Sequence, residues 1–406
     1  MLFQIQRSLS DFFERNLFER IIIYLFLSAF ISKFVFELVL GQWSFVQSQN
    51  KQWLFYGFLA LDYIISFKKI MNMRVTINPL SLFALLFFIM IAHGLFIGIT
   101  SHNTPFKILD DTIPLLMIAL NILRMQSYAE MKNPIDFRFI LNTTTWLAFI
   151  ACLFGLLGQT LGKPTRAGII ENSIYLPIVF AALFTLKPFP KKVGIMFVIM
   201  VILSMSALNR TSMLFFVLMI STYSLLQIIK SPSKGLLTMI AVIISCSMFW
   251  IMLPKGSSTY NRIVGIAAID LSARTGSVGE RQAEQDAVAA KLELGGTTRQ
   301  WTGLGFGGTY EVQFTHKYLK NYGHAHYAWV WFNLRFGYIG YIYLSILTSI
   351  LLYNGTRGLL LKTETSIFIS LLCLSGLIYL MTYVNALFLA SGIQFLYINN
   401  RYKSKT

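Results

Sequence analysis

Long apolar runs recur along this chain, and they restrict the folds open to it more than any other feature. About twelve of them are long enough, or nearly so, to cross some 30 Å of hydrocarbon as helices. They cover residues 21–40, 53–67, 80–100, 112–126, 139–158, 173–187, 193–208, 211–229, 235–254, 327–352, 366–382 and 385–399. Of 406 residues, 55% are hydrophobic and only 13% are charged, which is unlike a soluble domain. The sequence predicts an all-α polytopic membrane protein with about twelve transmembrane helices, forming one domain over 1–406.

The positive charge follows the pattern that orients membrane proteins. Lys and Arg gather in short loops, and such loops stay on the cytoplasmic side. They fall in every second loop, at residues 68–74, 124–138, 187–192, 230–234 and 357–362, and in the tail at 401–405. Both termini are therefore predicted to be cytoplasmic, and the net charge of +17 reflects topology rather than nucleic-acid binding.

One large polar loop, residues 255–326, precedes the tenth predicted span, and the alternation of sides places it outside the cytoplasm. A helix is predicted within it from Gly279 to Leu294, where good helix formers are followed by Gly295-Gly296. Arg281 would lie in the first turn of this helix, where unpaired backbone N–H groups favour an anion. So long a polar excursion in an apolar chain indicates the functional part of the protein.

Several arginines are predicted on the outer side, against the charge bias: Arg166, Arg210, Arg262, Arg274 and Arg281. A guanidinium binds phosphate through two parallel charge-assisted hydrogen bonds. These arginines therefore suit an anionic ligand with phosphates at headgroup depth. The alternative is that each one reaches out to the phosphates of membrane lipids.

Three histidines, His316, His324 and His326, end the polar loop. Zinc binding is one interpretation, but no Cys accompanies them. Imidazole also suits proton removal near neutral pH, so His326 at the entry to a span is the candidate general base. The remaining alternative is a histidine that is merely hydrogen-bonded at the membrane interface. The glycines between Gly303 and Gly308 predict a tight turn rather than a dinucleotide loop.

These residues resemble the O-antigen ligases and related polysaccharide polymerases of the bacterial inner membrane. The resemblance rests on three motifs. The first is His324-Ala325-His326 followed, after ten intervening residues, by Gly337-Tyr338-Ile339-Gly340. The others are Asn209-Arg210-Thr211-Ser212 at an outer turn, and Val278-Gly279-Glu280-Arg281 followed by Trp301-Thr302-Gly303-Leu304-Gly305. Tyr327 departs from the pattern, because the family usually has Asn, Ser or Gln there.

The resemblance implies a GT-C-like membrane glycosyltransferase. It would move a glycan from undecaprenyl diphosphate to a sugar hydroxyl of lipid A-core on the periplasmic face, by inversion and without a metal or other cofactor. His326 would be the base, and Arg210 and Arg281 would neutralise the diphosphate. The remaining expected substrate-binding residues are Arg166, Arg274, His324, Tyr327, Gly303 and Gly305.

Other functions stay open on the sequence. A polymerase would use the end of a growing glycan as acceptor, and an oligosaccharyltransferase would use a protein hydroxyl. A transporter or flippase also has about twelve spans, but its polar residues are expected at the middle of the membrane in two similar halves. A scaffold for envelope assembly would tolerate loss of His326 and the arginines.

Overall fold

The computed structural model of the chain describes residues 12–13, 15–31, 47–67, 79–125, 276–314, 317–361 and 364–382, with scattered positions in 136–150 and 221–247. These ranges are mostly helical. The helices are α2 (Leu17–Ile31), α3 (Gln47–Ile65), α5 (Pro79–Thr100), α6 (Pro105–Met125), α14 (Gly276–Leu294), α15 (Gly296–Thr302), α16 (Ala328–Leu361) and α17 (Glu364–Thr382).

Six of these helices, α2, α3, α5, α6, α16 and α17, fall on predicted apolar runs, so those runs are confirmed as helices. By length and composition, two helices in the described ranges are able to cross a membrane: Ser81–Thr100 in α5 and Ala328–Leu360 in α16. The apolar parts of α3 and α17, Trp53–Ile65 and Ser366–Leu377, are shorter. The other six predicted spans lie outside the described ranges or include only scattered described positions.

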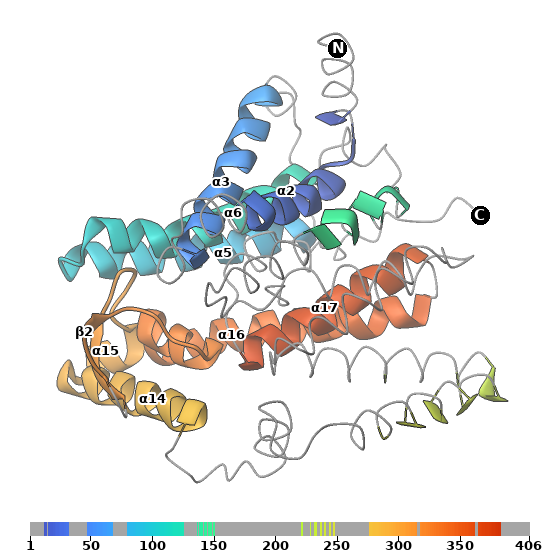
Figure 1. The fold of residues 1–406 in the computed structure, drawn as a ribbon. Coiled ribbons are helices and arrows are strands. Elements are labelled where there is room, and N and C mark those ends of the chain that lie inside the picture. The colour runs from blue at the N-terminus through green and yellow to red at the C-terminus, as the bar shows by residue number, and fades with distance from the viewer. Residues whose placement is uncertain are drawn as a thin grey trace, which may run out of the picture.

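The long helices pack in pairs around a shared apolar core. Helix α5 packs along α6, α2 packs along α3, and α16 folds back on α17 across a short connection. Figure 1 shows the α16–α17 pair running beneath the layer that contains α5 and α6. Fully buried aromatic side chains from four helices join this core: Phe55, Phe87, Phe336 and Phe368.

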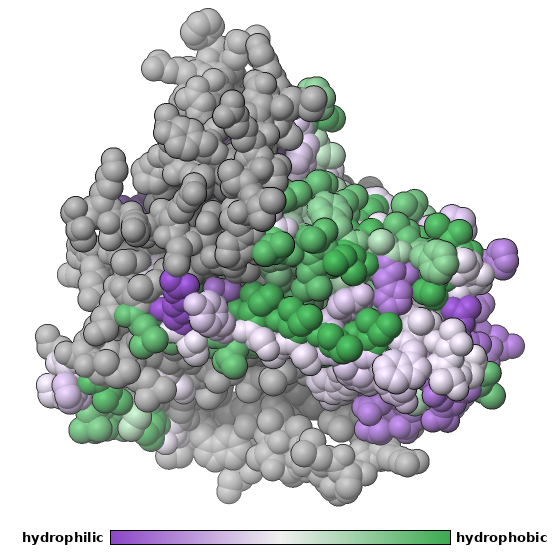
Figure 2. All heavy atoms as spheres, turned by 180° about the vertical axis from the view of Figure 1, so that it is seen from behind, coloured by the Kyte–Doolittle hydropathy of each residue, from purple (hydrophilic) through white to green (hydrophobic). Residues whose placement is uncertain are grey.

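Large apolar side chains also cover the outside of α5. Exposed examples are Leu82, Leu85, Ile89, Phe96 and Ile99. Figure 2 shows apolar side chains gathered over one face, with hydrophilic side chains along its edge. A contiguous apolar face of this kind is rare on a soluble monomer and indicates contact with lipid or another apolar partner.

The described part of the polar loop is folded rather than open. Helix α14 and a hairpin of β1 (Tyr310–Phe314) and β2 (Lys317–Tyr322), paired antiparallel, enclose a second small core. The prediction of an all-α protein is therefore wrong at this hairpin. The physical reason is the alternation of buried and exposed residues along β1, a period of two that belongs to strands.

Helix α16 is kinked at Gly337, the first glycine of the Gly337-Tyr338-Ile339-Gly340 motif. Its φ is 60° and its ψ is −144°, which is outside the helical region. A Cβ there would lie 2.3 Å from the carbonyl oxygen of Gln300 in α15. A glycine is required both by the dihedral angles and by this close approach, and the kink lets α15 pack directly on α16.

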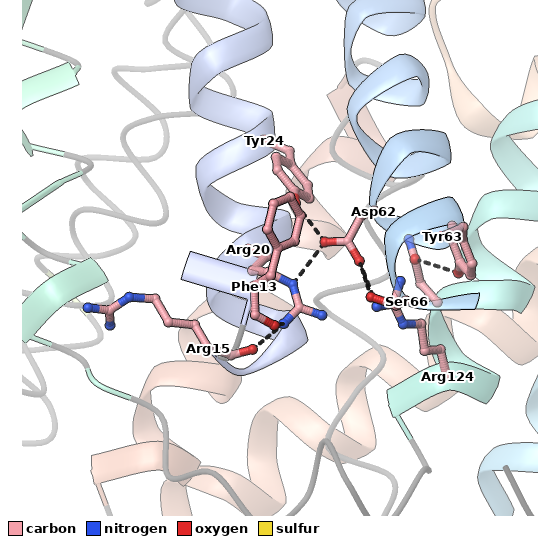
Figure 3. Close-up of polar contacts among 9 residues, drawn as sticks. Phe13, Arg15, Arg20, Tyr24, Asp62, Tyr63, Ser66 and Arg124 are labelled. Carbon is pink, nitrogen blue, oxygen red and sulfur yellow. Dashed lines mark hydrogen bonds and ion pairs between the residues drawn. The ribbon is translucent and has the colours of Figure 1, made fainter. Parts of the chain in front are cut away.

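A buried ionic cluster at the C-terminal end of α6 joins three helices. Asp62 of α3 lies 2.8 Å from Arg20 Nε of α2 and 2.6 Å from Arg124 Nη2 of α6. The Tyr24 hydroxyl donates to the same carboxylate at 2.6 Å. Figure 3 shows these side chains converging on Asp62. Because Arg20 and Asp62 are fully buried, the cluster fixes the relative positions of α2, α3 and α6.

Candidate functional site

Two predicted catalytic residues come together where α14 meets the start of α16. The guanidinium carbon of Arg281 lies over the ring of Tyr327, 5.1 Å from its centroid, at a distance typical of a cation–π contact. Tyr327 directly follows His326, and its ring stacks on Trp329 with centroids 4.0 Å apart. Arg281 and His326, distant in the sequence, therefore share one site.

His326 is held by Glu284, a residue that the sequence analysis did not select. The imidazole Nδ1 lies 2.7 Å from Glu284 Oε1, and the backbone N–H of His326 donates to Oε2 at 3.0 Å. The imidazole side chain is 32% exposed, whereas that of Glu284 is 1% exposed. Glu284 follows Arg281 by three residues on α14, so the two side chains share one face of that helix. The imidazole reaches solvent while its partner does not.

His324 lies beside His326, but the surroundings of the two imidazole rings differ. Its ring meets that of His326 edge to face, with centroids 5.1 Å apart, and its backbone oxygen accepts the Tyr310 hydroxyl at 2.6 Å. Desolvation by the surrounding protein disfavours the charged form and is the larger cause that lowers the pKa of His324 to about 4. The neighbouring His326 also lowers this pKa. The residue as a whole is nevertheless exposed at the surface. His324 is expected to be neutral at pH 7.

Arg335 and Asp111 support the loop that bears these histidines. Arg335 of α16 is buried, and its Nε lies 2.8 Å from Asp111 Oδ2 of α6. The guanidinium also donates to the backbone oxygens of Gly308 and Gly323, and Asp111 accepts the N–H of Gly307 at 2.7 Å. The pair therefore fixes both ends of the segment that contains the hairpin. A charged residue within an apolar run is a functional signal. Arg335 was not selected from the sequence, although this signal could have identified it.

The predicted substrate-binding glycines Gly303 and Gly305 are buried between helices. A Cβ on Gly303 would lie 2.4 Å from the carbonyl carbon of Arg335, and one on Gly305 would lie 2.2 Å from the backbone nitrogen of Gly98 in α5. The turn is thus tight, as predicted, and it joins the loop to the ends of α5 and α16. A contact with substrate stays a prediction for both glycines.

The position of Arg281 within its helix differs from the prediction. Helix α14 begins at Gly276, three residues before the predicted start, because one glycine in a helix costs only about 1 kcal/mol and does not end it. Arg281 therefore lies in the second turn, and the expectation that it stands beside unpaired N–H groups of the first turn is wrong. Its cation–π contact with Tyr327 orients it instead.

The remaining predicted residues, Arg166, Arg210 and Arg274, lie outside the described residues, as does His316. Comparison with models of known protein families finds no match, and no curated protein matches the chain closely enough to identify a relative. The family resemblance therefore rests on the motifs quoted above, and the function is argued from the site.

Proposed function

We propose that the protein is an inverting membrane glycosyltransferase of the O-antigen ligase type. It takes a glycan from undecaprenyl diphosphate and joins it to a sugar hydroxyl of lipid A-core. The observation that carries the proposal is that α14 places Arg281, a group suited to phosphate, against Tyr327 and holds the preceding residue His326, a group suited to proton removal, through Glu284. A donor diphosphate and an acceptor hydroxyl require these two chemistries side by side.

The reaction needs a base on one side of the sugar and positive charge on the other. His326 removes the proton of the acceptor hydroxyl as its oxygen bonds to C1 of the donor sugar. The bond from C1 to the diphosphate oxygen breaks on the opposite face, which inverts the configuration. Arg281, with Arg210, stabilises the departing diphosphate, a task that a divalent cation performs in many other transferases.

We place the site on the periplasmic face of the bacterial inner membrane, in a protein of about twelve spans with both termini in the cytoplasm. The turn below the site packs against the last residues of α5 and the first half of α16, the two helices of membrane length. The site is therefore near one end of both helices, and this position supports our proposal that it lies at the depth of headgroup phosphates. The apolar face of α5 supports contact with membrane lipids.

Deletion of the gene tests the proposal and separates a ligase from a polymerase. A ligase mutant should carry bare lipid A-core on its surface while intact polymer accumulates on the lipid carrier. A polymerase mutant should instead carry core with a single repeat unit. The measurement is the band pattern of surface polysaccharide together with the extracted lipid-linked glycan. Unchanged surface glycan in the deletion strain would contradict both transferase functions.

Replacement of Arg281 tests the diphosphate contact. Arg281→Ala should lose nearly all transfer, and Arg281→Lys should lose most of it, because lysine keeps the charge but not the two-pronged geometry. Lys291→Ala is the matched control, since Lys291 is an exposed cation on the same helix. Transfer is measured with purified protein and lipid-linked glycan extracted from the deletion strain. Normal transfer by Arg281→Ala would make this arginine a surface or lipid contact only.

A further inference from the structure

The geometry points to Glu284 as the positioning residue of the candidate base. We propose that Glu284 selects the tautomer of His326 in which Nδ1 carries the proton, and stabilises the imidazolium that forms when Nε2 takes the proton of the acceptor hydroxyl. This inference rests on the proposed function, because it concerns how the same site works. No family motif quoted above includes Glu284, so its assignment comes from the structure alone.

Both oxygens of Glu284 are used by a single residue. Oε1 contacts Nδ1 of His326 at 2.7 Å, and Oε2 accepts the backbone N–H of the same residue at 3.0 Å. Two contacts to one residue fix both the backbone and the ring, so the imidazole has little freedom to rotate. The carboxylate itself is 1% exposed, and a buried carboxylate is retained only where its contacts compensate for lost water.

The chemistry of the two groups decides which nitrogen carries the proton. A carboxylate is an acceptor without a proton to donate, so the nitrogen that it contacts must be the donor. In neutral His326 the proton is therefore on Nδ1, and the lone pair is on Nε2. That nitrogen accepts the proton of the acceptor sugar, while the carboxylate offsets the positive charge that develops. The same division of roles operates in the Ser-His-Asp arrangement of hydrolases.

The rest of the loop is built to keep this geometry. The Tyr310 hydroxyl holds the backbone oxygen of His324 at 2.6 Å, and the Ala325 side chain between the two histidines is fully buried. Arg335 holds the preceding Gly323 through its backbone oxygen. The backbone is thus anchored at several points besides Glu284, so loss of the Glu284 side-chain contact alone should leave the loop folded.

Glu284→Gln is the informative substitution because it keeps size and one hydrogen bond. The backbone N–H of His326 is a fixed donor, so the amide oxygen must face it and the amide NH2 must face Nδ1. The amide would then donate to Nδ1 and force the proton onto Nε2, which is the wrong tautomer for a base. We expect kcat for glycan transfer to fall about 10²–10⁴-fold with KM for the donor little changed. Glu293→Gln, at an exposed carboxylate near the end of α14, should have wild-type kcat.

A double-mutant cycle separates positioning from general support of the fold. If Glu284 acts through His326, then adding Glu284→Gln to His326→Ala should cost nothing beyond His326→Ala alone. Donor, acceptor and protein are those of the transfer assay, with lipid-linked glycan from the deletion strain. The positioning role would be overturned if Glu284→Gln reduced kcat as much in the His326→Ala background as it does in the wild-type protein. Glu284 would then be a structural residue.

A chemical probe tests the tautomer without any glycan. Diethyl pyrocarbonate acylates an unprotonated imidazole nitrogen, and mass spectrometry locates the label. His326 should be labelled in the wild-type protein and lose its labelling in Glu284→Gln, while His324 stays labelled in both. Equal labelling of His326 in the two proteins would overturn the inference even if the protein proves to be a transferase. Conversely, the expected labelling together with no transfer by the wild-type protein would uphold the Glu284–His326 pair and refute the proposed function.

Discussion

Replacement of His326 by alanine should reduce the rate of glycan transfer by about 10²–10⁴-fold, the range that a positioned general base contributes. Binding of the lipid-linked donor should survive, because it depends on the arginines rather than on the imidazole. The measurement is a single-turnover assay in detergent, with donor binding determined on the same preparation. His326 is the residue that reaches solvent while held by a buried carboxylate, which is the geometry of a base.

His324→Ala is the matched control for this experiment. His324 lies two residues before His326 and is also a histidine. Its backbone oxygen accepts the Tyr310 hydroxyl, and its ring packs against the rings of His326 and Tyr322. Its replacement should therefore cost less. Wild-type turnover in His326→Ala, or a defect confined to donor binding, would remove His326 from the role of base and leave its position at the start of α16 as structural.

The sequence predicted the helices well because lipid imposes a simple rule. A run of about twenty apolar residues has to be helical where no water is present to pair its backbone. This rule located both ends of α5 and the start of α16 to within one residue, whereas α16 continues to Leu361, past the predicted end at residue 352. The β1–β2 hairpin was not predicted because its strands are short, with five residues in β1 and six in β2. The alternation from Tyr310 to Phe314 was a signal for a strand, although a short one.

The site was predicted only in part, for a physical reason. His326, Arg281 and Tyr327 carry chemistry that a spacing motif can indicate, and the structure brings them together. Glu284 looked like one of several acidic residues on a surface helix, and nothing in its local sequence marks it as buried. Its role depends on which face of α14 packs against the loop. That is decided by packing between distant segments, such as Val288 of α14 and Leu334 of α16, which belong to the same small core.

Removal of the Asp62 carboxylate should have the largest effect on stability. Asp62 is the partner of both Arg20 and Arg124, and all three side chains are buried. Asp62→Asn would leave two buried guanidinium groups without the charge that compensates them. Breaking such a pair by removing one partner costs about 3–5 kcal/mol. The free energy of unfolding in mixed micelles measures this cost, with Asp286→Asn, an exposed residue of α14, as a control expected to change it by less than about 0.5 kcal/mol.

The loss of stability in Asp62→Asn has two possible physical causes: buried arginine charges without a partner, or the loss of the contacts by which Asp62 joins α2, α3 and α6. The two causes predict different results for one further variant. If uncompensated charge is the cause, removal of the charges together should restore stability, since buried ionic groups replaced by apolar residues of similar size are often neutral or stabilising. The variant combines Arg20→Met, Asp62→Leu and Arg124→Met with Tyr24→Phe, which removes the hydroxyl that donates to Asp62. Its free energy of unfolding should recover most of the deficit of Asp62→Asn. A combined variant no more stable than Asp62→Asn would mean that the carboxylate holds α2, α3 and α6 together through its specific contacts, and that its loss is not chiefly a matter of charge.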